Sequence, residues 1–264
     1  MEYVDNLKSD LLEHAGFVHA FFTRLGGVSR GPFESLNLSL SVGDDPEHVE
    51  ENLRRAAATL GVNRERLYVT RQVHGCDGVV LGAGAASAQV SALAADANVS
   101  NCAGVACGVR TADCVPILLA DPESGRVAAV HAGWRGVACN IAGAAVKQMQ
   151  ALGSRPNALL AAIGPHISVD AFEVGEDVAA TLARCAGGEA AVIRAAGRKP
   201  HVDLARILGA QLEGAGIEMT QIERVRGCTF AEESSFFSHR RDGAVGGRML
   251  SAIVSRESVA VDPR

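Results

Sequence analysis

Two histidines and one cysteine lie in short segments that are rich in glycine, alanine and arginine rather than in large apolar residues. The segments are RQVHG at residues 71–75, TADC at residues 111–114 and VHAGWRG at residues 130–136. Imidazoles and a thiolate are ligands that zinc accepts, and three protein ligands leave a fourth position open for water or substrate. His74, Cys114 and His131 therefore predict one metal site of the catalytic kind. A Cys–His catalytic pair is the alternative use of the same groups.

The segments around Cys114 and His131 predict how these two residues meet. Residues 115–120 and 127–131 are short apolar runs typical of buried strands, and DPESG at residues 121–125 is typical of a turn. A hairpin pairs the start of one strand with the end of the next. We therefore expect Cys114, at the entrance to the first strand, to lie near His131, at the exit of the second.

Several arginines lie in or near the segments that hold the predicted ligands. Four of them are predicted to contact substrate or phosphate: Arg71, Arg135, Arg240 and Arg241. Arg110 is also within a few residues of a predicted ligand. A guanidinium binds phosphate or carboxylate through two parallel hydrogen bonds, so their convergence would indicate an anionic reactant. For the Arg-Arg pair, a solvated surface or an ion pair with Asp242 is the alternative.

The remaining elements predict a fold of the α/β (α+β) class. Strands are expected at residues 17–24, 67–73, 78–81, 105–109, 115–120, 127–131, 159–163, 225–230 and 250–255. Helices are expected at residues 44–60, 136–152, 175–186 and 202–214, and a loop or weak helix at residues 83–95. Because the sequence contains no internal repeat or linker, we expect one mixed-sheet domain over residues 1–264 with flanking helices. Two similar halves are the alternative organisation.

Composition narrows the class of protein. Of the 264 residues, 48% are hydrophobic, which is enough to build a core and argues against disorder. The net charge of −5 argues against a nucleic-acid partner and against binding to anionic membranes. The N-terminal segment lacks the pattern of a signal peptide, and no apolar run is long enough to span a bilayer. We therefore expect a cytoplasmic protein; monomer and small homo-oligomer are both compatible with the sequence.

The cysteines do not indicate a disulfide framework. There are seven of them, an odd number, and no two form a C-x-x-C pair. Cys76, Cys139 and Cys185 have no ligand-like neighbours, so simple burial or exposure is expected for each. This pattern agrees with a reducing compartment.

The motifs QVHG, TADC-x-P, HAGWRG, IGP, FEVG and FFSHRRDG-x-x-x-GR occur in this order. In this the chain resembles the polyphenol oxidase or laccase-domain family, which includes the peptidoglycan editing factor and a type of purine nucleoside phosphorylase. The resemblance runs from FFTRLGGVS near the N-terminus to GRMLSAI near the C-terminus, and so covers nearly the whole chain.

The resemblance implies a single domain of the laccase-domain type in which His74, Cys114 and His131 bind one zinc ion. It implies phosphorolysis of adenosine, inosine, guanosine or methylthioadenosine, with nucleoside and phosphate as substrates, and deamination of adenosine. It leaves copper-dependent phenol oxidation and peptidoglycan editing as further activities. The chain departs from the family pattern at Leu53, where arginine is common and Arg54 is the neighbouring substitute, and at His166, to which no role is assigned.

The chemistry of the residues favours some of these activities over others. A multicopper oxidase uses clustered His-x-His pairs, whereas none of the eight histidines here forms such a pair. A single His₂Cys copper site is still possible chemically. A metal-free hydrolase or amidase acting on peptidoglycan precursors, with Cys114 as nucleophile and His131 as base, is a second hypothesis. A non-catalytic metal-binding protein is the third, although it would normally have a fourth protein ligand, for which His166 is the candidate. Trp134 is expected to pack behind the loop rather than to stack on a purine.

Overall fold

Two β-sheets packed face to face form the centre of the fold in the computed structural model, which describes residues 4–82 and 84–257. The larger sheet has six strands: β4 (Gly78–Leu81), β5 (Ala97–Ser100), β7 (Val115–Ala120), β8 (Val127–Ala132), β9 (Leu160–Ile163) and β12 (Ile222–Arg224). Their order across the sheet is β12-β9-β7-β8-β5-β4. The sheet is mixed, because β4 runs parallel to β5 and β12 runs parallel to β9 while the central pairs are antiparallel.

The second sheet has five strands drawn from distant parts of the chain. They are β1 (Asn6–Leu7), β2 (His19–Phe22), β3 (Leu67–Val69), β6 (Ala106–Thr111) and β13 (Met249–Val254). Their order is β1-β2-β13-β6-β3. Strands β6 and β13 contact β7 and β8 of the larger sheet, and a buried apolar cluster that includes Phe21, Val109, Leu118 and Ala129 fills the space between them. β10 (Val192–Ile193) and β11 (His201–Val202) form a separate two-stranded sheet.

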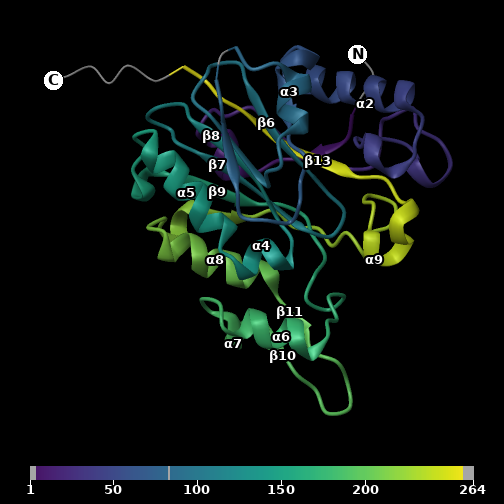
Figure 1. Ribbon diagram of the computed structural model, residues 1–264, viewed down its shortest axis with the longest axis vertical. Helices are drawn as coiled ribbons and strands as arrows, with labels where there is room; N and C mark the ends of the chain where they lie inside the picture. Colours follow the sequence, from purple (N-terminus) through teal and green to yellow (C-terminus); the bar gives the residue numbers. More distant parts are fainter. Residues whose placement is uncertain (1–3, 83, 258–264) are drawn as a thin grey trace.

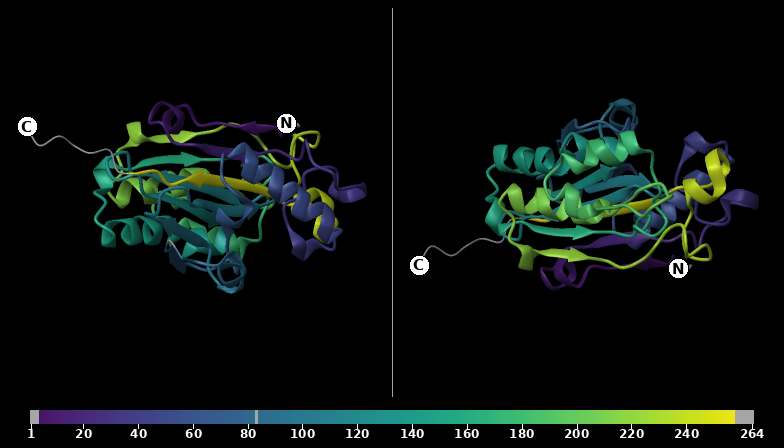
Figure 2. Two further views of the ribbon diagram at one scale, coloured as in Figure 1. Left: turned by 90° about the horizontal axis from the view of Figure 1, so that it is seen from above. Right: turned by 90° about the horizontal axis from the view of Figure 1, so that it is seen from below.

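Helices cover the outer faces of both sheets (Figures 1 and 2). The helices of the described residues are α1 (Asp10–His14), α2 (Pro46–Thr59), α3 (Ser87–Ala92), α4 (Trp134–Ala138), α5 (Ile141–Ala151), α6 (Glu176–Ala183), α7 (Gly188–Ala191), α8 (Leu204–Gly214) and α9 (His239–Asp242). Of these, α6 and α7 pack on α4 and α8 rather than on either of the two large sheets. α5 packs on β4, β5 and β8, and α8 packs on α5. On the other side, α2 buries Val49, Leu53 and Ala56 against the five-stranded sheet. Among the described residues, no helix is long and apolar enough to span a membrane.

Most predicted elements are confirmed. The mixed α/β class is correct, β4 and β7 have the expected bounds, and α2 begins after Asp45, whose side chain accepts a hydrogen bond from the Glu47 N–H. Most of the other predicted strands and helices begin or end within a few residues of the expected positions, and residues 87–92 of the weakly patterned segment are helical. Residue 83 lies outside the described residues. Several short elements were not predicted: β1, β5, β10, β11, α1, α7 and α9.

Two predicted elements are wrong. The single helix over residues 136–152 is two helices, because Asn140 adopts a left-handed conformation (φ +62°) and its side chain caps α5 by accepting from the Gly143 N–H. The strand over residues 225–230 does not form. The strand in this region is instead β12, which pairs with β9, and Gly227 just beyond it has φ +148°.

Candidate metal centre

The β7–β8 hairpin places Cys114 and His131 side by side, as the sequence predicted. The two strands are antiparallel, with Val115 opposite Ala132 and Pro116 opposite His131. Cys114 immediately precedes β7, and His131 is the next-to-last residue of β8. Because a hairpin brings the start of its first strand to the end of its second, the thiol and the imidazole meet at one end of the sheet.

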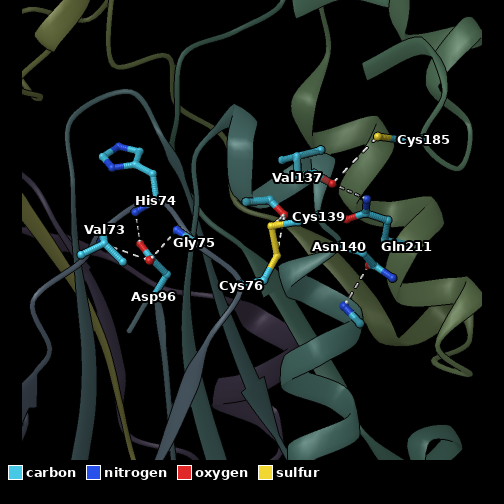
Figure 3. The surroundings of a disulfide bond; sticks show 12 residues. Val73, His74, Gly75, Cys76, Asp96, Val137, Cys139, Asn140, Cys185 and Gln211 are labelled. Carbon is cyan, nitrogen blue, oxygen red and sulfur yellow. Dashed lines mark hydrogen bonds between the residues drawn. A yellow bond between two sulfur atoms is a disulfide. The ribbon is translucent and has the colours of Figure 1, made fainter. Parts of the chain in front are cut away.

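His74 reaches the same place from the loop between β3 and β4. Its backbone has φ +60°, which is uncommon for a residue other than glycine. The loop is held in this form by the carboxylate of Asp96, which accepts hydrogen bonds from the backbone N–H groups of Val73 (3.1 Å), His74 (2.9 Å) and Gly75 (2.7 Å) (Figure 3). Asp96 precedes β5 and is buried.

The three side chains converge closely. Their potential ligand atoms all lie within 4.8 Å of one another, and Sγ of Cys114 lies 3.9 Å from Nε2 of His74. Gly133 permits this approach, because a Cβ at that position would lie 2.8 Å from Cδ2 of His74 and 3.1 Å from Sγ of Cys114. Gly133, the first glycine of the HAGWRG motif, is thus required by the packing of two predicted ligands.

Asp96 also orients His131. Its Oδ1 atom accepts a 2.7 Å hydrogen bond from Nδ1 of His131, and the backbone N–H of His131 donates to the carbonyl of Asp96 at 2.7 Å. With Nδ1 engaged, Nε2 is the nitrogen left to bind a metal. Burial alone would lower the pKa of His131, but Cys114 and the Asp96 carboxylate raise it to about 9.

Cys114 has the character of a thiolate. Burial alone would raise the pKa of its thiol, but the neighbouring His131 and His74 lower it to about 6. A thiolate beside two imidazoles is a donor set that suits zinc, and a tetrahedral zinc would hold a nitrogen and a sulfur ligand about 3.5 Å apart. The observed 3.9 Å between Sγ of Cys114 and Nε2 of His74 is close to this value. The group therefore fits a metal site with three protein ligands.

The ligands open onto a cavity of about 690 Å³. Residues from several distant segments line it: Ser39, Leu40, Ser41, Thr70, Arg71, Gln72, His74, Ser91, Arg110, Thr111, Ala112, Cys114, His131, His239 and Arg248. Three arginines contribute to the wall, and none of the described lining residues is acidic. The volume is in the range of small-molecule sites, and the charge favours an anionic ligand.

The predicted arginines occupy different positions. Arg71 lines the cavity, whereas the guanidinium of Arg135 lies over the ring of Trp134 at 4.5 Å, away from the lining. Trp134 packs against the main apolar core, as expected.

The pair in FFSHRRDG also lies outside the cavity lining. Arg240 donates to the carbonyl of Glu173 at 2.8 Å. Arg241 forms an ion pair with Asp242 at 2.8 Å and donates to three backbone carbonyls. For Arg241 this is the alternative considered above, an ion pair with Asp242, whereas Arg240 contacts the backbone of a different segment.

The residues at which this chain differs from the family pattern lie outside the cavity lining. Leu53 is buried in the core beneath α2, and Arg54 forms an ion pair with Glu51 at 2.8 Å on the surface, so Arg54 does not substitute for an arginine in the cavity. Nδ1 of His166 donates to the carbonyl of Gly164 at 2.8 Å, and His166 is not part of the ligand group found in the described residues.

Sequence reasoning missed three residues of the site. Asp96 carried a signal, because it is the single charged residue in the run of small residues AADANVS. Arg248 lies in the GR pair that ends the last motif, and Gln72 lies in RQVHG, but neither was singled out. Their roles depend on contacts between strands far apart in the sequence, which spacing does not reveal.

A disulfide between Cys76 and Cys139 adjoins the centre (Figure 3). The expectation of simple burial or exposure for these two cysteines is therefore wrong. Cys76 lies two residues after His74, and Cys139 is the C-cap of α4, so the bond ties the ligand loop to the helical layer with a Cα–Cα distance of 6.1 Å. The pairing joins residues 63 positions apart, which explains why no short spacing indicated it.

Comparison with known proteins agrees with this architecture. The chain is 43% identical over 236 residues to the purine nucleoside phosphorylase of Deinococcus radiodurans, covering 89% of this chain and 88% of that protein. It is 36% identical over 254 residues to adenosine deaminase RL5 from an unknown prokaryotic organism, covering 93% and 97% of the two chains. The crystal structure of YlmD from Geobacillus stearothermophilus superposes with a TM-score of 0.87 at 34% identity, covering 97% of this chain and all of that one. Residues 18–256 match the model of the family described as multi-copper polyphenol oxidoreductase laccase, and the chain belongs to that family.

Proposed function

We propose that this protein is a zinc-dependent purine nucleoside phosphorylase that also deaminates adenosine. The observation that carries the proposal is the convergence of His74, Cys114 and His131 within 4.8 Å at the wall of a cavity that holds three arginines. The names of the relatives, purine nucleoside phosphorylase and adenosine deaminase, agree with these two reactions.

Phosphorolysis breaks the bond between the ribose C1′ atom and the purine nitrogen. A phosphate oxygen forms the new bond to C1′, and the departing base takes up a proton, so that nucleoside and phosphate yield base and ribose 1-phosphate. The cavity residues suit this reaction, because arginine side chains hold phosphate and His239, which lines the cavity but is not among the proposed metal ligands, offers an imidazole for proton transfer. The proposed substrates are adenosine, inosine, guanosine and methylthioadenosine.

The residues of the centre have distinct tasks in this proposal. His74, Cys114 and His131 would hold the metal, and Asp96 would orient His131 and the His74 loop. When bound, zinc supplies a Lewis acid with one open coordination position. The same cavity would serve deamination, in which water replaces the amino group of adenosine and ammonia leaves.

The test combines a metal analysis with an assay of nucleoside turnover. Purified protein should contain about one zinc per chain, and it should release adenine or hypoxanthine only when phosphate is present. Cys114→Ala should abolish turnover, whereas Cys102→Ala, a free cysteine outside the cavity lining, should not change it. Full turnover by Cys114→Ala would exclude the proposed centre.

A second candidate function is a metal-free hydrolase or amidase for peptidoglycan precursors. It is favoured by one observation, the Cys114, His131 and Asp96 series, in which the carboxylate orients the imidazole next to the thiol. This enzyme would keep its activity in strong chelator and would be alkylated by iodoacetamide at Cys114. Loss of activity on chelation and recovery with zinc would favour the phosphorylase. Recovery with copper and phenol turnover would instead indicate an oxidase.

A further inference from the structure

Two arginines that the proposed metal centre does not use line the same cavity, Arg110 from β6 and Arg248 from the segment that leads into β13. Arg110 is in β6 and pairs with Leu250 of β13, and Arg248 lies two residues before Leu250. The pairing of β13 with β6 therefore brings the segment that holds Arg248 to the end of β6 that holds Arg110, and both side chains line the cavity.

Side chains from other segments fix the backbone of these arginines. The amide of Gln72 forms two hydrogen bonds with the backbone of Arg110, from Arg110 N–H to Oε1 at 2.8 Å and from Nε2 to the Arg110 carbonyl at 2.7 Å. Oδ1 of the buried Asn37 accepts from the backbone N–H groups of Arg248 (3.0 Å) and Ser39 (3.1 Å). Arg110, Arg248 and Ser39 are thus held in place before any ligand binds.

Within the described residues, neither guanidinium group is ion-paired with a carboxylate, and the only negative groups that act on Arg248 from nearby are Cys114 and Asp113. Nη1 of Arg110 donates to Oγ of Ser39 at 3.4 Å, and its buried Nε has no hydrogen-bond partner among the described residues. Nη1 of Arg248 donates only to the carbonyls of Gly246 and Gly247. Within the described part of the chain, neither arginine forms an ion pair with a carboxylate, and the cavity wall contributes no acidic residue.

Burial without a counter-ion is costly for a cation. Burial lowers the pKa of Arg110 to about 10, with a further contribution from Arg64, and burial also lowers the pKa of Arg248. An anion between the two groups would offset this cost and satisfy the free guanidinium N–H groups. A tetrahedral oxyanion suits the site best, because guanidinium groups donate to it in pairs and the Ser39 hydroxyl can add a donor.

We propose that Arg110 and Arg248, with the hydroxyl of Ser39, form the subsite for the phosphate co-substrate. The reaction served by this subsite rests on the function proposed above, whereas the binding of a phosphoryl group rests on these residues alone. The same chemistry would suit the 5′-phosphate of a nucleotide, so the experiment separates the two sources.

The experiment measures binding and turnover in Arg110→Gln and Arg248→Gln variants. Arg194→Gln is the matched control, because it removes an exposed arginine that pairs with Glu176 far from the cavity lining. Loss of one charged hydrogen-bonding partner corresponds to a weakening of about 10- to 100-fold. We therefore expect KM for phosphate, and Kd for inorganic phosphate by calorimetry, to rise by that factor in both cavity variants and to stay unchanged in the control.

Other readouts distinguish this role from a structural one. KM for the nucleoside should change less than about threefold, which is well below the effect of losing one hydrogen bond to a charged group. The rate of adenosine deamination, a reaction that needs no phosphate, should also change less than about threefold. Arg248→Lys, which keeps the charge, should recover part of the phosphate affinity, and it remains informative if Arg110→Gln does not fold. If no nucleoside is turned over, the proposed function fails, and calorimetry with phosphate still tests the subsite.

Two results would overturn the proposal. One is an unchanged Kd for phosphate in folded Arg248→Gln and Arg248→Lys variants. The other is tight binding of adenosine 5′-monophosphate that depends on both arginines while inorganic phosphate binds equally well with and without them. The second result would assign the subsite to a nucleotide substrate.

Discussion

Oδ1 of Asp96 lies 2.7 Å from Nδ1 of His131, and the same atom accepts the backbone N–H of His74 at 2.9 Å. One buried carboxylate thus fixes the ring of one proposed ligand and the loop of another. Burial alone would raise the pKa of Asp96, but the hydrogen bonds from His131 and from the Gly75 N–H hold it below its usual value. The group therefore remains an acceptor at neutral pH.

Asp96→Asn should weaken metal binding more than it weakens the fold. Loss of a residue that orients a ligand costs about 10- to 100-fold in metal affinity, and an amide cannot accept from all of these donors at once. The measurement is a zinc titration against a competing chelator. Asp121→Asn is the control, because Asp121 is also buried and accepts backbone N–H groups, but at the opposite end of the same hairpin. Equal zinc affinities in the two variants would contradict the role of Asp96.

Gly133→Ala should disturb the same centre by steric contact. The backbone of Gly133 (φ −73°) suits alanine, so the effect comes from a Cβ 2.8 Å from His74 and 3.1 Å from Cys114. We expect zinc affinity to fall by at least about tenfold, with little change in the melting temperature of the metal-free protein. Gly214→Ala, where an added Cβ meets open space, should keep wild-type affinity. A wild-type zinc content in Gly133→Ala after dialysis against chelator would show that the ligands can move aside.

The sequence predicts best those features that depend on residues close together in the chain. The β7–β8 hairpin was predictable because two apolar runs flank the Asp121–Gly125 turn, and the hairpin brought Cys114 and His131 together. The third proposed ligand, His74, was placed with them by its motif rather than by any local pattern. Its actual position depends on Asp96, whose contacts cross 22 residues of sequence.

The errors have physical causes of a similar kind. Asn140 splits the predicted helix because asparagine tolerates the left-handed conformation and caps the next helix, which a pattern of apolar residues does not reveal. The predicted strand at residues 225–230 fails because the Cys228 N–H is taken by the side chain of Glu232 at 2.7 Å instead of by a neighbouring strand. Arg248 and Arg110 become neighbours only through the register of β13 on β6.

The stability of the protein should depend on pH through Glu223. This carboxylate in β12 joins α1 to the edge of the six-stranded sheet, accepting from the Ser9 hydroxyl (2.5 Å) and from the N–H of Leu11 (2.8 Å). Burial alone would raise the pKa of Glu223, but these hydrogen bonds give a net lowering. A lowered pKa means that the stabilisation is complete above the usual glutamate value of about 4.3 and is lost as pH falls through the folded value.

Glu223→Gln should therefore cost about 1 kcal/mol of unfolding free energy at pH 7, the value typical of a helix cap. The difference from wild type should shrink below pH 4 or so, since the wild-type carboxyl is then protonated as well. Urea unfolding of wild type and variant at pH 7 and at about pH 3 measures the loss of unfolding free energy and its decrease at low pH. Glu213→Gln, an exposed position on α8, should have no effect at either pH. A deficit that persists undiminished at the lower pH would mean that the charge of Glu223 is not its source.

Reduction of the Cys76–Cys139 disulfide should affect stability and metal binding to different extents. Opening a loop whose paired positions are 63 apart in sequence costs about 4 kcal/mol by the entropy of the unfolded chain. A phosphine reductant should therefore lower the unfolding free energy of the wild type and leave Cys76→Ser unaffected. Cys102→Ser, which removes a free thiol, should respond as the wild type does. Zinc affinity should fall less on reduction than in Asp96→Asn, because Asp96 still holds the loop through three backbone N–H groups. A larger loss of zinc affinity on reduction than in Asp96→Asn would show that the disulfide, and not the carboxylate, positions His74.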